Sequence, residues 1–406
     1  MTQPWSAQLD PWLDQHGCRA LLVCADTSTD PWLAPFVGAA RLGTCFLIAP
    51  RDGTPRLAYL SPMERDEAAA SGVELLTPDD LDVQRWARDN ASYEEIVAES
   101  IAQGLSHCGV APGRLAIAGR LSAGQVLGVC RDLETDGWHF VAAEEILRRM
   151  RRAKSDDDLA EIRRVSAVVE AAFRDVAARL ASAAIAADGT LHSADRPLTV
   201  GTLRRAIARR FAEHELRQPE RNIIGPAEEG AVPHTTGTDD RVLRAGETLI
   251  VDLFPKGRLF TDCTRTFCVD EPPEVVTRAH RDVVDALVLA ESNARAGIEG
   301  WSLQEDVCHL LDERGWPTPI SEPSAERGYV HGLGHGVGYA LHENPSFREF
   351  QFDEGRLIEN DVITLEPGLY DPEAGWGIRV EDLYRVTADG VEPLTTLPRG
   401  LDPRSW

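Results

Sequence analysis

The chain of 406 residues has no long hydrophobic run and has fewer basic than acidic residues. Both features argue against particular classes of protein. No stretch reaches about 18 uninterrupted apolar residues, the length that a membrane-spanning helix needs. Lys and Arg number 42 against 66 Asp and Glu, which gives a formal net charge of −24. Because so acidic a surface repels phosphate groups and anionic lipids, we expect neither nucleic-acid nor membrane partners.

The cysteines show no sequence pattern that would indicate disulfide bonds or a metal site. The 8 cysteines are scattered, and none forms a C-x-x-C pair, which favours reduced, buried thiols over a disulfide framework. The first ten residues show neither the basic segment nor the apolar core of a signal peptide. We therefore expect a cytoplasmic protein.

The length favours two domains, because a chain of this size exceeds one ordinary hydrophobic core. We place them at residues 1–150 and 151–406. The first alternates short apolar strands with helices, which predicts an α/β domain. The expected strands are 19–24, 44–49, 56–60, 115–118 and 138–141, and the expected helices are 93–108 and 122–133. This domain has no glycine-rich phosphate loop and no cluster of titratable groups, so we assign it no chemistry.

The second domain begins with a helix that its own first residues cap. Ser155 suits the N-cap position and Asp158 the third helical position. Apolar residues then recur at steps of three and four from Leu159 to Phe173, which predicts one buried stripe. Residues 182–197 read as a loop. Helices are expected at 202–214, 273–296 and 302–314, and strands at 249–254, 260–267, 362–365 and 377–381.

Two aspartates in this domain are candidate ligands. Asp252 follows a buried-type apolar run, and Asp262 comes ten residues later. Two strands joined by a tight turn would place both carboxylates side by side on one face. Two such acids can also be solvated turn residues, but the threonines after Asp262 offer supporting hydrogen bonds and favour a site.

Three histidines, His331, His335 and His342, fall within twelve residues of a glycine-rich segment. The glycines argue against a helix, and the spacing matches neither the H-E-x-x-H motif nor a dinucleotide fingerprint. A single histidine is usually a hydrogen-bonded structural residue, whereas three in one segment favour a site.

Glu366 and Glu381 each end an apolar, strand-like run, where an unpaired carboxylate would be costly. An ion pair between Arg379 and either glutamate would be a structural explanation. With Asp252, Asp262 and His335, however, they form a set of four carboxylates and one imidazole. Such a set suits two divalent ions, which together can activate a water and polarise a carbonyl.

These segments resemble the pita-bread metallopeptidases, which comprise Xaa-Pro dipeptidases (prolidases), Xaa-Pro aminopeptidases and methionine aminopeptidases. The resemblance spans roughly residues 150–400. It rests on Asp-Cys-Thr-Arg-Thr (262–266), His-Gly-Leu-Gly-His (331–335), Leu-Glu-Pro-Gly-Leu-Tyr (365–370) and Gly-Ile-Arg-Val-Glu-Asp (377–382). It implies an α+β chain, with an N-terminal α/β creatinase-like domain followed by a C-terminal pita-bread catalytic domain.

The resemblance also implies a role for each candidate residue. Asp252 would hold one metal, Asp262 and Glu381 would bridge both, and His335 and Glu366 would complete the second. A bridging hydroxide would be the nucleophile and Glu366 the proton shuttle. His342 and His234 match histidines that contact the scissile carbonyl and amide, and His331 matches one near the substrate. The implied cofactors are two divalent metal ions per subunit (Mn, Co or Zn), and the implied assembly is a homodimer.

Two departures from the family pattern bear on the reaction. The two aspartates are ten residues apart instead of the usual eleven. Where some prolidases carry an arginine for the substrate carboxylate, this chain has Ser346, with Arg348 and Arg356 nearby. We expect an Xaa-Pro dipeptidase acting on small proline-containing peptides, with an Xaa-Pro aminopeptidase as the alternative. A catalytically dead binding module, or a metal-free creatinase-like hydrolase, fits less well because all five ligands are present.

Overall fold

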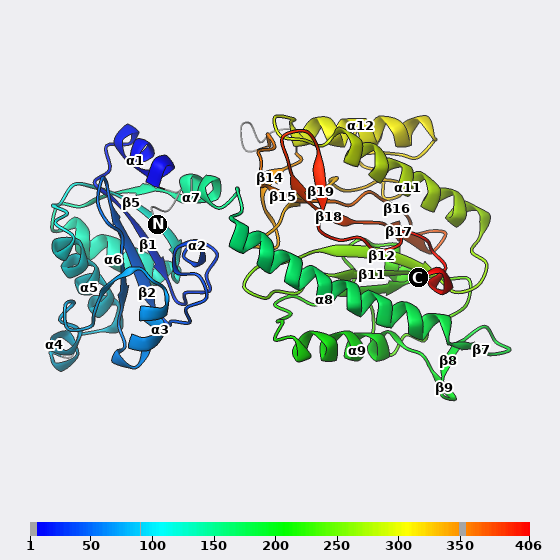
Figure 1. Ribbon diagram of the computed structural model, residues 1–406, viewed down its shortest axis with the longest axis horizontal. Coiled ribbons are helices and arrows are strands. Elements are labelled where there is room, and N and C mark those ends of the chain that lie inside the picture. The colour runs from blue at the N-terminus through cyan, green and yellow to red at the C-terminus, as the bar shows by residue number, and fades with distance from the viewer. Residues whose placement is uncertain (1–5, 90, 349–354) are drawn as a thin grey trace. The chain divides into compact units, whose positions relative to one another are not determined.

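The computed structural model describes residues 6–89, 91–348 and 355–406. The chain divides into two compact units, Met1–Arg151 and Arg152–Trp406 (Figure 1). The architecture is α+β, with an N-terminal α/β sheet unit and a C-terminal pita-bread unit, as the sequence predicted.

The N-terminal unit is built on one mixed sheet with the strand order β4-β3-β2-β1-β5-β6. Its strands are β1 (Ala20–Ala25), β2 (Cys45–Pro50), β3 (Arg56–Tyr59), β4 (Glu74–Leu76), β5 (Arg114–Arg120) and β6 (His139–Ala142). Its helices are α1 (Ser6–Gln15), α2 (Ala34–Val37), α3 (Arg65–Ala70), α4 (Val83–Arg88), α5 (Tyr93–His107), α6 (Ala123–Glu134) and α7 (Glu144–Met150). The strands and helices expected between residues 19 and 141 all form.

Strand β1 is buried on both faces because helices cover both sides of the sheet. Leu21 and Val23 belong to the core that α1, α2, α3 and α7 complete. Leu22 and Cys24 point the other way, toward the core formed with α5 and α6. This two-sided burial explains why the sequence of β1 is uniformly apolar and not alternating.

The C-terminal unit combines two helix-covered sheets. One has the order β10-β11-β12, and the other has the order β14-β13-β15-β18-β19, with β16 and β17 paired beside it. The helices are α8 (Asp156–Ala181), α9 (Val200–Glu213), α10 (Ala227–Gly230), α11 (Glu274–Asn293) and α12 (Gly300–Glu313). The strands are β10 (Ile223–Pro226), β11 (Thr248–Leu253), β12 (Cys263–Cys268), β13 (His335–Gly336), β14 (Glu343–Ser346), β15 (Val362–Leu365), β16 (Gly368–Asp371), β17 (Trp376–Arg379), β18 (Asp382–Val386) and β19 (Val391–Pro393).

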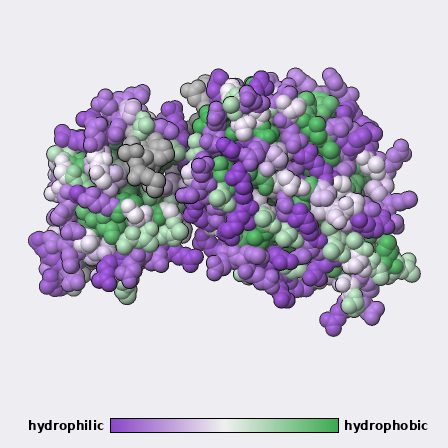
Figure 2. Space-filling view, viewed as in Figure 1, coloured by the Kyte–Doolittle hydropathy of each residue, from purple (hydrophilic) through white to green (hydrophobic). Residues whose placement is uncertain are grey.

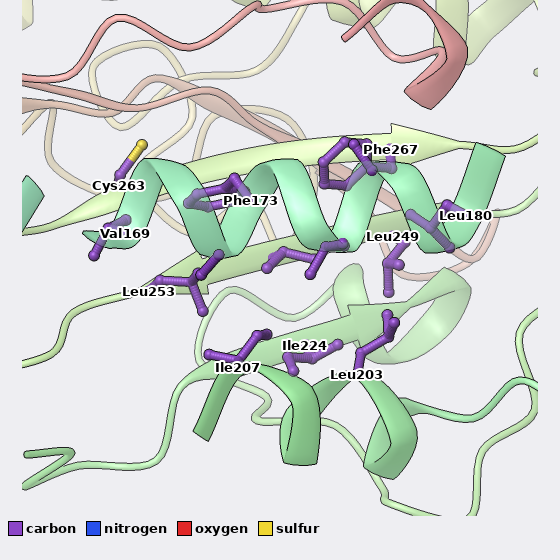
Figure 3. Close-up of a cluster of buried hydrophobic side chains, with 14 of the residues drawn as sticks. Val169, Phe173, Leu180, Leu203, Ile207, Ile224, Leu249, Leu253, Cys263 and Phe267 are labelled. Carbon is purple, nitrogen blue, oxygen red and sulfur yellow. The ribbon is translucent and has the colours of Figure 1, made fainter. Parts of the chain in front are cut away.

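Helix α8 begins with the predicted capping box. The Ser155 hydroxyl accepts from the Asp158 backbone N–H, and the Asp158 carboxylate accepts from the Ser155 backbone N–H. The buried stripe of α8 then packs, together with α9, on one face of the β10-β11-β12 sheet. Figure 3 shows Phe173 of α8 and Ile207 of α9 on either side of strand residues such as Leu253. This core fixes which face of β11 and β12 turns away from the helices.

The second sheet has a matching core. Residues of α11 and α12 pack on Ile363 and Leu365 of β15 and on Ile378 of β17. Alternation along each strand then leaves Thr364 of β15 and Arg379 of β17 on the opposite face. The two sheets therefore pack their apolar residues against helices and carry polar residues on the faces that the helices do not cover.

One local expectation needs correction. Residues 182–197 are not a loop: β7 (Ala184–Ile185), β8 (Leu191–Ser193) and β9 (Arg196–Pro197) form a small antiparallel sheet. Its first turn runs through Gly189, whose φ is +84°, a conformation that glycine adopts readily. The turn expected between Asp252 and Asp262 does form, although the strands on either side of it are shorter than expected. Lys256 and Phe260 form an antiparallel bridge in the same register as Asp252 and Thr264, so the chain reverses over residues 257–259.

The visible surface is predominantly hydrophilic, as the net charge suggests, with a small apolar area over the β7 hairpin (Figure 2). Ile185 there is 49% exposed. None of the helices in the described ranges combines the length and apolar character that a membrane crossing requires.

Candidate metal centre

The five predicted ligands come from separate segments of the C-terminal unit, and strand alternation aims them. In β11, Leu249, Val251 and Leu253 face the core under α8 and α9. Asp252 therefore points to the uncovered face, where Thr264 of β12 lies opposite it in the ladder. Asp262 precedes Thr264 by two residues, so it projects to the same side although it lies outside the strand. The prediction that the two aspartates share one face is thus consistent with the ladder.

The remaining candidates approach from the second sheet. His335 opens β13, Glu366 directly follows β15, and Glu381 lies between β17 and β18. The backbone N–H of Glu381 donates to the carbonyl oxygen of Thr264 at 3.1 Å, which fastens the two sheets together at the site. Asp262, His335 and Glu381 each offer one ligand atom, and these atoms lie within 4.8 Å of one another. His335 Nε2 is 3.5 Å from Glu366 Oε1 and 3.8 Å from Asp262 Oδ2.

The carboxyl groups at this centre have raised pKa values, because they are buried close to one another. Burial raises the pKa of Asp262 and Glu381 well above the usual range, and neighbouring carboxylates raise it further. Burial also raises the pKa of Glu366, to about 8, with Asp252 contributing in the same direction. Several carboxylates crowded out of water repel one another unless a cation or protons neutralise them.

Two oxygens at the centre also lack hydrogen-bond partners within the described chain. Asp252 Oδ1 and Asp262 Oδ1 are buried and receive no hydrogen bond. A buried carboxylate oxygen without a donor costs free energy, and a divalent cation is a suitable partner for it. The resemblance to the pita-bread metallopeptidases implies divalent metal ions, and these residues fit them.

Threonine and arginine support the ligands. Thr264 Oγ1 donates to Glu381 Oε2 at 2.7 Å, as its position after Asp262 suggested. Arg379 Nη2 donates to Asp252 Oδ2 at 2.6 Å, and its Nη1 donates to the Tyr370 hydroxyl at 3.0 Å. The ion pair considered between Arg379 and Glu366 or Glu381 therefore forms with Asp252 instead. The pairing follows from the packing of β17 against β11 and β12, which brings the Arg379 side chain against the Asp252 carboxylate.

The histidines line the same region. The rings of His335 and His342 meet edge to face, with their centroids 4.4 Å apart. Burial lowers the pKa of His335 to about 3, and His342 contributes in the same direction. His331 Nε2 lies 2.9 Å from the Tyr370 hydroxyl, and burial lowers the pKa of His331 to about 3. Both imidazoles are therefore neutral near pH 7, the form in which a ring nitrogen can bind a metal or accept a proton.

His342 and His234 are the more exposed members of the group. Burial lowers the pKa of His342, the charge of Glu220 raises it, and His234 lowers it. The backbone before His234 is fixed because the Pro233 carbonyl accepts from Arg379 Nη1 at 3.3 Å. All the predicted site residues therefore belong to one region, with Asp262, His335, Glu366 and Glu381 at its centre.

Sequence reasoning assigned no role to Tyr370, which joins His331 to Arg379 through its hydroxyl. Its position at the end of the Leu-Glu-Pro-Gly-Leu-Tyr segment was a signal that could have been used. The two arginines considered for the substrate carboxylate have different settings. Arg356 Nη2 is paired with Glu299 Oε1 at 2.7 Å, whereas Arg348 is exposed and borders residues 349–354, outside the described ranges.

A pita-bread unit with a centre of buried carboxylates and histidine defines a class of metal-dependent hydrolases. The chain belongs to metallopeptidase family M24, whose pattern matches residues 160–388.

Three comparisons show where this chain lies within that family. A curated Xaa-Pro dipeptidase from Pyrococcus furiosus is 34% identical over 44% of this chain and 48% of its own length, so that alignment spans about half of the relative. An Xaa-Pro dipeptidase from Pyrococcus horikoshii is 31% identical over 64% of this chain and 68% of its own length. The solved prolidase from Pyrococcus horikoshii OT3 shares the fold, with a TM-score of 0.75 and 22% identity over 98% of this chain and 99% of that chain.

Proposed function

We propose that this protein hydrolyses Xaa-Pro peptide bonds, most simply as an Xaa-Pro dipeptidase with two divalent ions per subunit. The observation that carries the proposal is the convergence of Asp262, His335 and Glu381, whose ligand atoms lie within 4.8 Å of one another. Glu366 adjoins this group, because its Oε1 lies 3.5 Å from His335 Nε2. Asp252 contributes a buried carboxylate oxygen that receives no hydrogen bond from the described residues. The relatives named as Xaa-Pro dipeptidases support the choice of substrate.

The proposed ligands are Asp252, Asp262, His335, Glu366 and Glu381. Bound divalent ions would supply a water activated for attack and would polarise the scissile carbonyl. Mn, Co and Zn all suit this donor set, which consists mainly of oxygens.

The protein's own groups would handle the proton and the developing charge. A carboxylate beside the activated water is suited to take a proton and return it to the leaving amine. The family resemblance assigns this task to Glu366, whose Oε1 lies 3.5 Å from His335 Nε2. His342 would meet charge that develops on the carbonyl oxygen, with His234 and His331 beside the peptide. The leaving nitrogen of any peptide bond must be protonated to depart, and in an Xaa-Pro bond it is a tertiary amide nitrogen without N–H.

The choice between dipeptidase and aminopeptidase depends on the substrate carboxylate. A dipeptidase must recognise a carboxylate one residue beyond the cleaved bond, and a guanidinium is its best partner. Arg356 is paired with Glu299, so Arg348 is the better candidate. If neither arginine binds the substrate carboxylate, an Xaa-Pro aminopeptidase acting on longer peptides becomes the better assignment.

Three peptides test this choice: Xaa-Pro, Xaa-Pro-amide and Xaa-Pro-Xaa. We expect Xaa-Pro to be cleaved fastest and the amide poorly. Arg348→Ala should raise KM for Xaa-Pro by about tenfold or more, equivalent to about 1.4 kcal/mol, whereas Arg356→Ala serves as the matched control. Equal cleavage of all three peptides would favour the aminopeptidase. Full activity in protein shown by elemental analysis to be metal-free would contradict the proposal as a whole.

The proposed cellular setting is the cytoplasm, which the free state of all the cysteines supports. We also propose a homodimer, on the basis of the family resemblance. The role proposed for residues 1–150 is to govern which peptides enter, because the described residues of that domain include no group that could hold a metal ion.

A further inference from the structure

The segment from His335 to Glu343 is fastened by a buried ion pair to Lys154, which lies just before α8. Lys154 Nζ lies 2.8 Å from Glu343 Oε1, and both side chains are only 1% exposed. Lys154 Nζ also donates to the Arg152 carbonyl at 2.8 Å. Glu343 Oε2 accepts from the Ala340 backbone N–H at 3.1 Å, which closes the segment on itself.

Further contacts fix the same segment on other sides. The Tyr339 hydroxyl donates to Asp158 Oδ1 at 3.0 Å. The segment is therefore held both by Lys154, just before α8, and by Asp158, in the first turn of α8. From the β11–β12 connection, Lys256 Nζ donates to the Tyr339 carbonyl at 3.1 Å, and the Phe260 N–H donates to the Gly338 carbonyl at 2.8 Å. The connection that carries Asp262 is therefore tied to the segment that carries the histidines.

The ion pair lies directly against the backbone of Gly338. A Cβ at this position would lie 2.3 Å from Lys154 Cε and 2.9 Å from Glu343 Oε1, so even a methyl group would displace the pair. Glu343 opens β14, and neighbouring side chains in an extended segment point to opposite sides. Glu343 is accordingly buried against Lys154, whereas its neighbour His342 is exposed.

Burying two charges costs free energy that their attraction does not always repay, so such a pair is weak support for stability by itself. A pair in this place does fix geometry, because Glu343 cannot shift without moving His342. We propose that Lys154 is a positioning residue: through Glu343 it sets the position of the His342 imidazole over the metal centre. This inference rests on the proposed peptidase function only for its kinetic test.

The kinetic test is a double-mutant cycle between Lys154→Met and His342→Ala, measured on an Xaa-Pro dipeptide. Lys154→Met should lower kcat by about 10- to 100-fold, since small misplacements of a catalytic group cost this much. KM and the metal content per chain should stay within about threefold. In the His342→Ala background, the same substitution should change kcat by less than about threefold, because the group that it positions is gone.

Equal loss of kcat in both backgrounds, or a loss explained by missing metal, would overturn the proposal. Where Lys154→Met does not fold, two other variants take its place in the same cycle. The pair Lys154→Met with Glu343→Gln removes both buried charges, and Gly338→Ala displaces the ion pair without changing charge. Arg152→Met is the matched control, because Arg152 forms an equally buried pair with Asp361 at 2.6 Å. It should lower stability but leave kcat within about threefold.

A second readout does not depend on activity. In zinc-loaded protein with ¹⁵N-labelled histidine, the His342 signal is identified by its loss in His342→Ala. Lys154→Met should shift or broaden that signal, and Arg152→Met should leave it unchanged. An unperturbed His342 signal in Lys154→Met would refute the positioning role. Failure of the wild-type protein to cleave any Xaa-Pro peptide would instead refute the proposed function and leave this readout intact.

Discussion

The crowded carboxylates predict that the metal-free protein becomes less stable as the pH rises from 7 to 8. Burial raises the pKa of Glu366 from its ordinary 4.5 to about 8, so the folded protein holds a proton that the unfolded chain has released. A group whose pKa is raised in the folded state contributes stability that is complete below its unfolded pKa. That stability is lost as the pH rises through the folded pKa.

The magnitude follows from the two pKa values. The interval from 4.5 to about 8 corresponds to at most about 5 kcal/mol. At pH 7.5 the folded state holds about three quarters of a proton on Glu366, so stability should fall by about 1 kcal/mol per pH unit. The window above pH 7 is chosen because histidines act with the opposite sign. The pKa of His331 and of His335 is lowered on folding, so the stability that they contribute is lost only as the pH falls through 6.5 and below.

The assay is urea unfolding of chelator-treated protein at several pH values between 7 and 8.5, for the wild type and for Glu366→Gln. The variant keeps the shape of the side chain but cannot ionise, so its stability should decline less steeply over this window. Added Mn should reverse the trend, because metal ligands bind in their ionised form. At 100 times its dissociation constant, a metal ion stabilises the fold by about 2.7 kcal/mol. Equal pH dependence in the two proteins, or a wild type that gains stability from pH 7 to 8, would refute the reasoning.

Four further outcomes are expected. Glu366→Ala should lose turnover by a factor of about 10² or more, because one change removes a proposed ligand and the proton carrier. His342→Ala should lose a substantial part of turnover but keep its metal, and steady-state rates with elemental analysis distinguish the two. Phe173→Ala should lower the free energy of unfolding by about 3–5 kcal/mol, because Phe173 is fully buried between α8 and the sheet; a change below 1 kcal/mol would contradict that packing. Light scattering should give the mass of a homodimer, and a strictly monomeric protein would contradict that proposal.

The sequence by itself determined the secondary structure wherever local signals were strong. The capping box at Ser155 and the buried stripe that follows it predicted α8, because both depend on spacing along a single helix. The apolar runs of the N-terminal unit likewise predicted five of its six strands, and the three-residue strand β4 was not predicted. Residues 182–197 were misread because β7, β8 and β9 are only two or three residues long, too short for a periodic pattern to show.

Most candidate ligands were visible in the sequence because Asp252, Glu366 and Glu381 each end an apolar run, where an unpaired charge is costly. Their mutual arrangement was not. It depends on the register Asp252–Thr264, on the contact between Thr264 and Glu381, and on the pair Arg379–Asp252. Each of these joins residues that are distant along the chain, so no local pattern encodes them. The tie between Lys154 and Glu343 spans nearly two hundred positions, and only the tertiary structure decided it, because packing of the two sheets brings α8 beside the histidine segment.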